Sequence, residues 1–289
     1  MNITILLPTR KRLSLLKKSV QSLIDNAREP NKLQFLFGVD EDDIETFNYL
    51  KESKYPNQLA LQFKPIGYEN LHKYNNTLAG YAQGKWIMFF NDDAVMQTKN
   101  WDEKIMDFED EFCLLRFKEQ TQHPYSIFPC FPQKWFYLLD HISLHGQNDA
   151  WLSEIAYMLD IMRDVDIEVI HDRADITGNN NDETFRARKY NEGNPDQRGD
   201  LHHIDMVKLR YKDALKINWL LGLLGQPNTF LPEHLKNKTD PFVLLKEKFD
   251  IYKKSGAVGA GKQHARVTDK REIKVSYSDL PKDKRQESR

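Results

Sequence analysis

A pair of aspartates follows one of the apolar runs of the sequence. Only Asn91 separates Asp92 and Asp93 from Ile87–Phe90, a run typical of a buried strand. Two carboxylates at the end of a buried strand repel each other and lose hydration, so they need a compensating cation. Oxygen ligands of this kind suit Mg²⁺ or Mn²⁺. The pair therefore predicts a divalent metal site, and the alternative is a solvated turn in which one aspartate caps a helix.

Polar clusters also follow two other apolar runs. Pro8-Thr9-Arg10 follows Ile3–Leu7, and the acidic residues 40–43 follow Leu33–Val39. Ligands of open parallel sheets bind beyond the carboxyl ends of the strands. We therefore expect the three clusters to meet at one ligand-binding edge.

The spacing of apolar residues predicts the elements that position these clusters. In the first hundred residues we expect strands alternating with helices, at 3–7, 13–26, 33–39, 44–52, 59–64, 70–82 and 86–90. This alternation is typical of a parallel sheet with crossover helices. Farther along we expect a loop with a short strand, a helix, a strand, a polar loop and two helices, at 125–136, 148–158, 167–170, 176–199, 203–224 and 242–254.

Composition favours a soluble globular protein. Of the 289 residues 40% are hydrophobic and 29% charged, which is enough to build a core. Two cysteines exclude a disulfide scaffold and a four-cysteine zinc site. The longest mostly apolar stretch, 217–225, is far shorter than the roughly 20 residues of a membrane-spanning helix. The N-terminus lacks the features of a signal peptide. We expect a cytoplasmic protein (in the host cytoplasm if viral) without a transmembrane segment.

Charge is distributed unevenly although the net charge is −1. Residues 236–289 contain 15 basic and 8 acidic side chains, a net of +7, whereas residues 1–235 carry a net of −8. A basic segment can contact a polyanion by replacing its counterions, or it can simply be a solubilising tail. The acidic body suits a site for a cation and a diphosphate.

The first hundred residues resemble the inverting GT-A glycosyltransferases of the family-two-like group, of viral or bacterial type. Three segments carry the resemblance: Pro8-Thr9-Arg10 after the first strand, Gly38–Asp43 after the second, and Asn76 to Gly84 leading to Asn91-Asp92-Asp93. Asn76 lies eight residues before Gly84, which lies seven before the start of the DxD-like motif. The match is looser over residues 145–185.

The resemblance implies an α/β GT-A fold, a Rossmann-like and mostly parallel sheet flanked by helices with a helical C-terminal extension. It implies a transferase domain at 1–200, made of a nucleotide-sugar half (1–100) and an acceptor half (101–200). A helical extension would follow at 201–255, and then a basic tail at 256–289 that is a candidate flexible segment.

The resemblance also implies residue roles on the donor side. Pro8, Thr9 and Arg10 would border the base and ribose, and Asp40 would accept a hydrogen bond from the base, most naturally from N3–H of uracil. Asn76 would supply a nucleotide-side amide. Asp92 would be a carboxylate near the ribose or sugar, and Asp93 would be a metal ligand. Asp40 could instead be a turn carboxylate, and Asn76 a plain helix residue.

Two residues of the second half receive roles in the same way. Asp149, in Gly146–Leu152, matches the aspartate that acts as catalytic base, although a carboxylate there could also cap a helix. His171 lies just past a strand, where several relatives carry a further metal ligand. The sequence departs from the family pattern at Asn91 and Asn148, which stand where acids are usual. Asn91 leaves the metal with one charge fewer.

The resulting hypothesis is a metal-dependent inverting glycosyltransferase, a hexosyl- or pentosyltransferase that uses a nucleotide-sugar, most naturally a UDP-sugar, with Mn²⁺ or Mg²⁺. One alternative is a sugar-nucleotide nucleotidyltransferase, which needs a glycine-rich loop that residues 8–12 lack. Another is a nucleic-acid-binding protein with an inactive GT-A domain. The acceptor could be a glycan, a lipid-linked sugar, a protein or hydroxymethylated DNA.

The basic tail makes the DNA hypothesis testable through salt. If duplex DNA is the acceptor, its affinity should fall steeply with ionic strength, because each neutralised phosphate releases a counterion. Deleting residues 256–289 should flatten the slope of log affinity against log salt, measured by fluorescence anisotropy with labelled duplex. An affinity that is independent of salt would contradict the DNA hypothesis.

Overall fold

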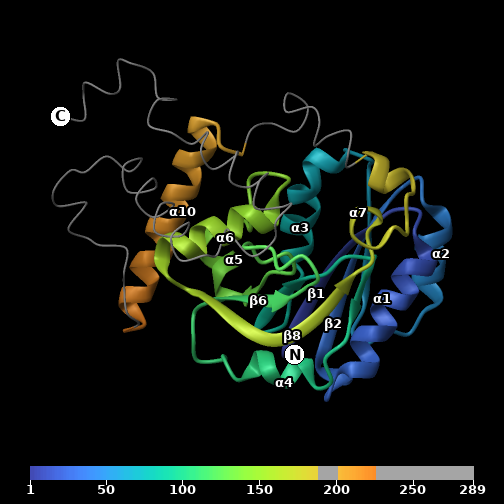
Figure 1. The fold of residues 1–289 in the computed structure, drawn as a ribbon, viewed down its shortest axis with the longest axis horizontal. Helices are drawn as coiled ribbons and strands as arrows, with labels where there is room; N and C mark the ends of the chain where they lie inside the picture. The colour runs from blue at the N-terminus through green and yellow to red at the C-terminus, as the bar shows by residue number, and fades with distance from the viewer. Residues whose placement is uncertain (188–200, 226–289) are drawn as a thin grey trace.

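The computed structural model describes residues 1–187 and 201–225. The helix expected at 242–254, the tail at 256–289 and part of the 176–199 loop lie outside the described residues. The fold is α/β, as expected, with a curled eight-stranded sheet flanked by helices (Figure 1). Its strands are β1 (Ile3–Thr9), β2 (Leu33–Asp40), β3 (Leu59–Phe63), β4 (Trp86–Phe89), β5 (Ala94–Met96), β6 (Leu114–Lys118), β7 (Cys130–Pro132) and β8 (Met162–His171).

Helices connect and cover these strands. The α-helices are α1 (Leu13–Asn26), α2 (Ile44–Glu52), α3 (Leu71–Ala79), α4 (Trp101–Met106), α5 (Lys134–Leu139), α6 (Asn148–Leu159), α7 (Ala174–Thr177) and α10 (Ile204–Leu223), and the 3₁₀ turns are η1 (Pro30–Lys32) and η2 (Tyr68–Asn70).

The first half of the sheet is parallel. Its strands run in the order β3-β2-β1-β4, and β1 lies between β2 and β4. All eight residues of β2 are buried, as expected for a parallel strand covered on both faces. The central pairings place Leu6 beside Phe89 and Thr9 beside Val39. The ends of β1, β2 and β4 therefore meet at one edge, as the polar clusters predicted.

The second half of the sheet is mixed. β7 pairs antiparallel with β4 and β6, β6 pairs parallel with β8, and β8 pairs antiparallel with β5. β8 begins five residues before the expected start at residue 167. From Asp164 to Val169 it alternates exposed and buried residues, and two of its exposed carboxylates pair with basic side chains of β6. Asp164 lies 2.6 Å from Arg116 and Asp166 lies 2.6 Å from Lys118.

The helix expected at 70–82 is shorter in the structure. Gly67 has a φ of +84° and starts the η2 turn, and α3 then runs only to Ala79. Tyr81 and Ala82 donate their N–H groups to carbonyls three residues earlier, so the chain leaves α3 through tight turns. The apolar residues after Ala79 thus keep the helical spacing in the sequence, although the helix itself ends at Ala79.

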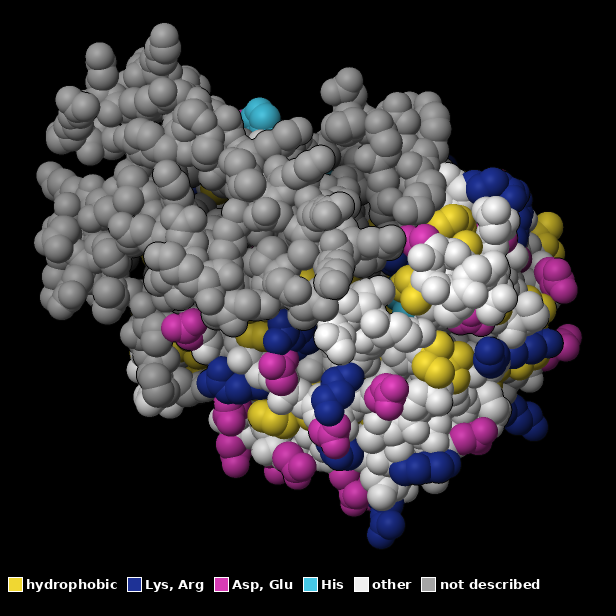
Figure 2. Space-filling view, in the orientation of Figure 1, with side chains coloured by type: hydrophobic (Ala, Val, Ile, Leu, Met, Phe, Trp, Pro, Cys, Tyr) yellow, Lys and Arg dark blue, Asp and Glu magenta, His cyan; other side chains and the backbone are white. Residues whose placement is uncertain are grey.

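Helix α10 docks onto the second half of the molecule. It packs against α6 and α5, so the described part of the expected 201–255 extension is helical. A buried ion pair joins α10 to α6, because Arg210 Nε of α10 lies 2.7 Å from a carboxylate oxygen of Glu154 of α6. Basic and acidic side chains are interspersed on the described surface of the face in Figure 2. None of the described helices combines the length and apolarity needed to cross a membrane.

Candidate functional site

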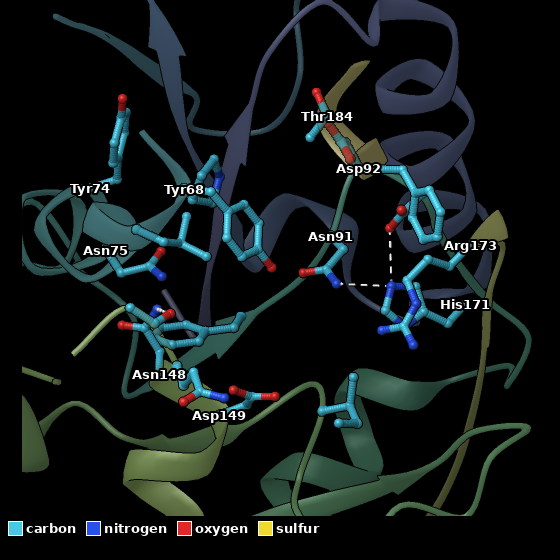
Figure 3. A pocket seen from close by; sticks show the side chains of 18 of the residues that line it. Tyr68, Tyr74, Asn75, Asn91, Asp92, Asn148, Asp149, His171, Arg173 and Thr184 are labelled. Carbon is cyan, nitrogen blue, oxygen red and sulfur yellow. Dashed lines mark hydrogen bonds and ion pairs between the residues drawn. The ribbon is translucent and has the colours of Figure 1, made fainter. Parts of the chain in front are cut away.

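A cavity of about 520 Å³ opens at the edge where the strand ends meet. Eight of the nine site residues proposed from the sequence line it: Pro8, Thr9, Arg10, Asp40, Asp92, Asp93, Asp149 and His171. They come from β1 and the residue after it, β2, the β4–β5 turn, α6 and β8. Figure 3 shows Asn91, His171 and Asp149 facing this cavity. The fold thus gathers residues that are far apart along the chain.

The acid pair at the end of β4 is neutralised by an arginine. Arg12 donates from Nη1 to Asp92 Oδ1 at 2.9 Å and to Asp93 Oδ2 at 3.1 Å, and Thr9 Oγ1 donates to Asp92 Oδ2 at 2.8 Å. Both carboxylates are buried. A side chain of the same protein therefore supplies one positive charge beside this pair.

Burial and this pairing shift the protonation of the cluster. Burial raises the pKa of Asp92 to about 6. Burial also opposes the charge on Arg12, but its bonds to Asp182, Asp92 and Asp93 outweigh that effect and raise its pKa. Burial likewise opposes the charge on Asp93, yet His171 and Arg12 hold its pKa below the ordinary value. Asp93 is consequently the carboxylate better suited to bind a cation.

His171 reaches Asp93 because β5 and β8 pair. In their register Ala94 lies opposite His171. His171 Nε2 lies 3.1 Å from Asp93 Oδ1 and 3.1 Å from the Asn91 amide nitrogen (Figure 3). A single Nε2 cannot both donate a proton to Asp93 and accept one from Asn91, so the three groups suit a shared cation or a flipped amide.

These groups fit a hard divalent ion. Adjacent ligands of an octahedral ion with bonds of about 2.1 Å lie about 3.0 Å apart. Asp93 Oδ1 and His171 Nε2 meet this spacing at 3.1 Å. The amide oxygen of Asn91 would supply a third ligand. Within residues 1–187 and 201–225 there is no group of three or more His, Cys, Asp and Glu side chains that could hold a metal.

Asp40 lies at another part of the cavity, held by two side chains. Tyr74 donates its hydroxyl to Asp40 Oδ1 at 2.5 Å, and Arg10 Nε lies 3.3 Å from Oδ2. Burial raises the pKa of Asp40, and the Tyr74 hydrogen bond opposes this. The rest of the acidic cluster is used locally: Asp42 pairs with Arg10 and Asp43 caps α2 by accepting from Thr46.

Asn76 is not among the residues that line the cavity. Its amide holds the loop before α6, donating to Ser143 O at 2.8 Å and accepting from Ile142 N at 2.8 Å. Asn75 lines the cavity instead, is 3% exposed, and has an Oδ1 without a hydrogen-bond partner among the described residues. Successive helix residues point about 100° apart, so a shift of one position changes which asparagine faces a ligand.

Asp149 enters the cavity from the first turn of α6. The loop before it lies against η2, where a Cβ on Gly146 would collide with the carbonyl oxygen of Glu69. Asn148 precedes it, is buried, and also has an unpartnered Oδ1 within the described structure. A carboxylate at the start of a 12-residue helix interacts favourably with the helix dipole.

The segment after β8 supplies two further charged residues, Arg173 and Asp182. Arg173 lines the cavity and pairs with Asp175. Asp182 accepts two hydrogen bonds from Arg12, at 2.6 and 2.8 Å, across 170 residues of sequence. Arg12 lies two residues beyond the Pro8-Thr9-Arg10 motif, and its pairing with Asp182 has no sequence signal, because ion pairs have no fixed spacing.

Comparison with known proteins shows the fold alone. No protein-family model matches the sequence, and no curated protein matches it at a significant level. Solved structures match over most of the chain. S. aureus TarS 1–349 in complex with UDP-GlcNAc matches with a TM-score of 0.54 and 12% identity, over 86% of this chain and 72% of that chain.

Two further structures are similar. Another structure of S. aureus TarS has a TM-score of 0.50 and 11% identity over 86% of this chain; only 49% of that chain is covered, so this protein spans about half its length. The mannosyltransferase PcManGT from Pyrobaculum calidifontis, in complex with GDP-Man and Mn²⁺, has a TM-score of 0.49 and 10% identity, over 93% of this chain and 79% of that chain. The fold is that of glycosyltransferases.

The contacts of Asp40 yield a testable prediction. Tyr74→Phe removes the hydrogen bond that stabilises the Asp40 carboxylate, so the pKa of Asp40 should rise further above its ordinary value. The pKa is measured by carboxyl carbon NMR over a pH titration. The control is Tyr49→Phe, which removes a hydroxyl bonded to Tyr55 instead and should leave Asp40 unchanged. An Asp40 pKa that stays constant or falls in Tyr74→Phe would refute the assigned contact.

Proposed function

We propose that this protein is a metal-dependent inverting glycosyltransferase that uses a nucleotide-sugar donor. The observation that supports it is one cavity that is lined by Asp40, by the Asp93–His171 pair and by Asp149. These are the parts that sugar transfer needs: a donor-binding region, a cation site for the leaving group and a base. The similarity to the fold of TarS supports the same conclusion.

The donor proposed is a UDP-sugar. Asp40 would accept a hydrogen bond from N3–H of uracil, and Pro8, Thr9 and Arg10 would border the base and ribose. Asp92 is held by Thr9 and Arg12 and would lie near the ribose or sugar. A bound UDP-GlcNAc in the TarS structure agrees with this donor class. Because Asn75 and not Asn76 faces the cavity, we assign the nucleotide-side amide to Asn75.

Asp93 and His171, together with Asn91, would hold Mn²⁺ or Mg²⁺. When bound, such an ion supplies positive charge that stabilises the leaving diphosphate. The ordinary alternative for His171 is a buried histidine that only supports the β5–β8 pairing. His171 Nε2 contacts both Asp93 and Asn91, and this double contact favours the ligand role.

Asp149 is proposed as the general base. It would accept the proton of the acceptor hydroxyl as the hydroxyl oxygen forms a bond to the anomeric carbon and the bond to the nucleoside diphosphate breaks. A single displacement of this kind inverts the anomeric centre. Asp149 is half-buried and lines the cavity, which keeps it within reach of an acceptor that enters there.

The proposed acceptor carries a hydroxyl group, and the candidates are glycans, lipid-linked sugars, proteins and hydroxymethylated DNA. The DNA hypothesis depends on the basic residues 236–289, which lie outside the described residues. A nucleotidyltransferase is disfavoured, because the loop after β1 carries the buried Arg12 side chain where a glycine-rich phosphate loop would be required.

The function is tested by donor hydrolysis and transfer. Purified protein with Mn²⁺ should release nucleotide from one of a panel of UDP- and GDP-sugars, and chelator should abolish the release. Asp149→Asn should lower the transfer rate by about 10²–10⁴-fold, the usual contribution of a general base, while donor affinity changes little. The matched control is Asp110→Asn, which removes an exposed carboxylate and should retain full activity.

Two outcomes would contradict this proposal. Full transfer by Asp149→Asn would remove the base assignment. Failure of the protein to bind any nucleotide-sugar or nucleotide, with all acceptor classes present, would reject the transferase function itself.

A further inference from the structure

The guanidinium of Arg12 has two occupied edges. Its inner nitrogen, Nη1, bonds to Asp92 and Asp93, which β4 fixes in place. Its outer edge, Nε and Nη2, forms a two-point contact with both carboxylate oxygens of Asp182, at 2.6 and 2.8 Å. Arg12 therefore joins the floor of the cavity to a segment that follows β8.

Asp182 is the more exposed of the partners of Arg12. The Asp182 side chain is 33% exposed, whereas those of Arg12 and Asp92 are each 7% exposed. Asp182 also accepts from Phe185 N at 2.8 Å, a bond within its own segment that would move with it. Asp92 is additionally bonded to Thr9 and cannot move without disturbing β1.

The same segment places carboxylates on the other arginines of the cavity. Asp175 bonds to Arg173 at 2.5 and 3.0 Å, and Glu183 lies 3.9 Å from Arg10. All three arginines line the cavity. Each of these three arginines thus has a carboxylate from positions 175–183 beside it.

We propose that the outer edge of Arg12 binds the diphosphate of the donor, and that Asp182 occupies this edge until the donor enters. The planar fork of a guanidinium binds two phosphate oxygens with the same geometry that it uses for a carboxylate. A diphosphate carries more charge than Asp182, so it can displace that side chain. This inference rests on the proposed function for the identity of the ligand as a nucleoside diphosphate.

Competition by Asp182 has a measurable consequence. A ligand that must displace an internal partner binds more weakly, in proportion to the fraction of molecules in which the site is open. Removing the Asp182 carboxylate should therefore tighten binding of any ligand that carries a diphosphate. It should not affect a ligand that contacts only the Asp40 end of the cavity.

The experiment measures affinity by calorimetry for three probes: UDP, uridine and inorganic pyrophosphate. Asp182→Asn and Asp182→Ala should each bind UDP and pyrophosphate roughly three- to tenfold more tightly than the wild type, with unchanged affinity for uridine. The control, Asp25→Asn, removes an exposed carboxylate of α1 that bonds only to Gln21 among the described residues, and it should change none of the three affinities. Arg12→Lys should weaken UDP binding while uridine binding persists.

The outcomes separate this inference from the proposed function. Unchanged or weaker UDP and pyrophosphate binding in both Asp182 variants, with uridine still bound, overturns the role of Asp182 and leaves the transferase proposal standing. Tighter pyrophosphate binding without any binding of uridine or UDP supports an anion site at Arg12 and rejects the nucleotide donor. An equal gain in Asp25→Asn would reduce the effect to net charge and overturn the inference.

Discussion

The charge of Arg12 is the interaction on which the site depends. Asp92 and Asp93 follow β4, whose four residues are all buried, so the charge of the two carboxylates must be balanced within a water-poor region. Arg12 comes from the turn after β1, and the parallel pairing of β1 with β4 brings the two turns together. The pairing of β5 with β8 then adds His171 on the other side of Asp93. Two strand pairings thus bring these charged side chains together in one cluster.

Much of this arrangement is predictable from local sequence pattern. Buried parallel strands appear as continuous apolar runs, and β1, β2 and β4 lie where such runs predict them. Their order in the sheet places the polar residues that follow them at one edge. The cavity at that edge follows from topology and does not require knowledge of any individual contact.

The remainder depends on contacts that local pattern does not encode. The Arg12–Asp182 pair joins residues 170 positions apart, and nothing in the spacing of either residue identifies the other. The exchange of Asn76 for Asn75 at the cavity depends on the exact start and rotation of α3, which η2 and Gly67 determine. The sequence predicts only residues 167–170 of β8, because the exposed acids Asp164 and Asp166 make the start of this strand look polar.

The central claim is that a divalent ion at Asp93 and His171 and the guanidinium of Arg12 together hold a diphosphate. The most direct test is a crystal structure with UDP and Mn²⁺, with anomalous diffraction recorded at the manganese edge. The account predicts one anomalous peak coordinated by Asp93 and His171, diphosphate oxygens against Arg12, and Asp182 withdrawn from Arg12. Manganese bound elsewhere, or a diphosphate bound while Asp182 stays on Arg12, would contradict it.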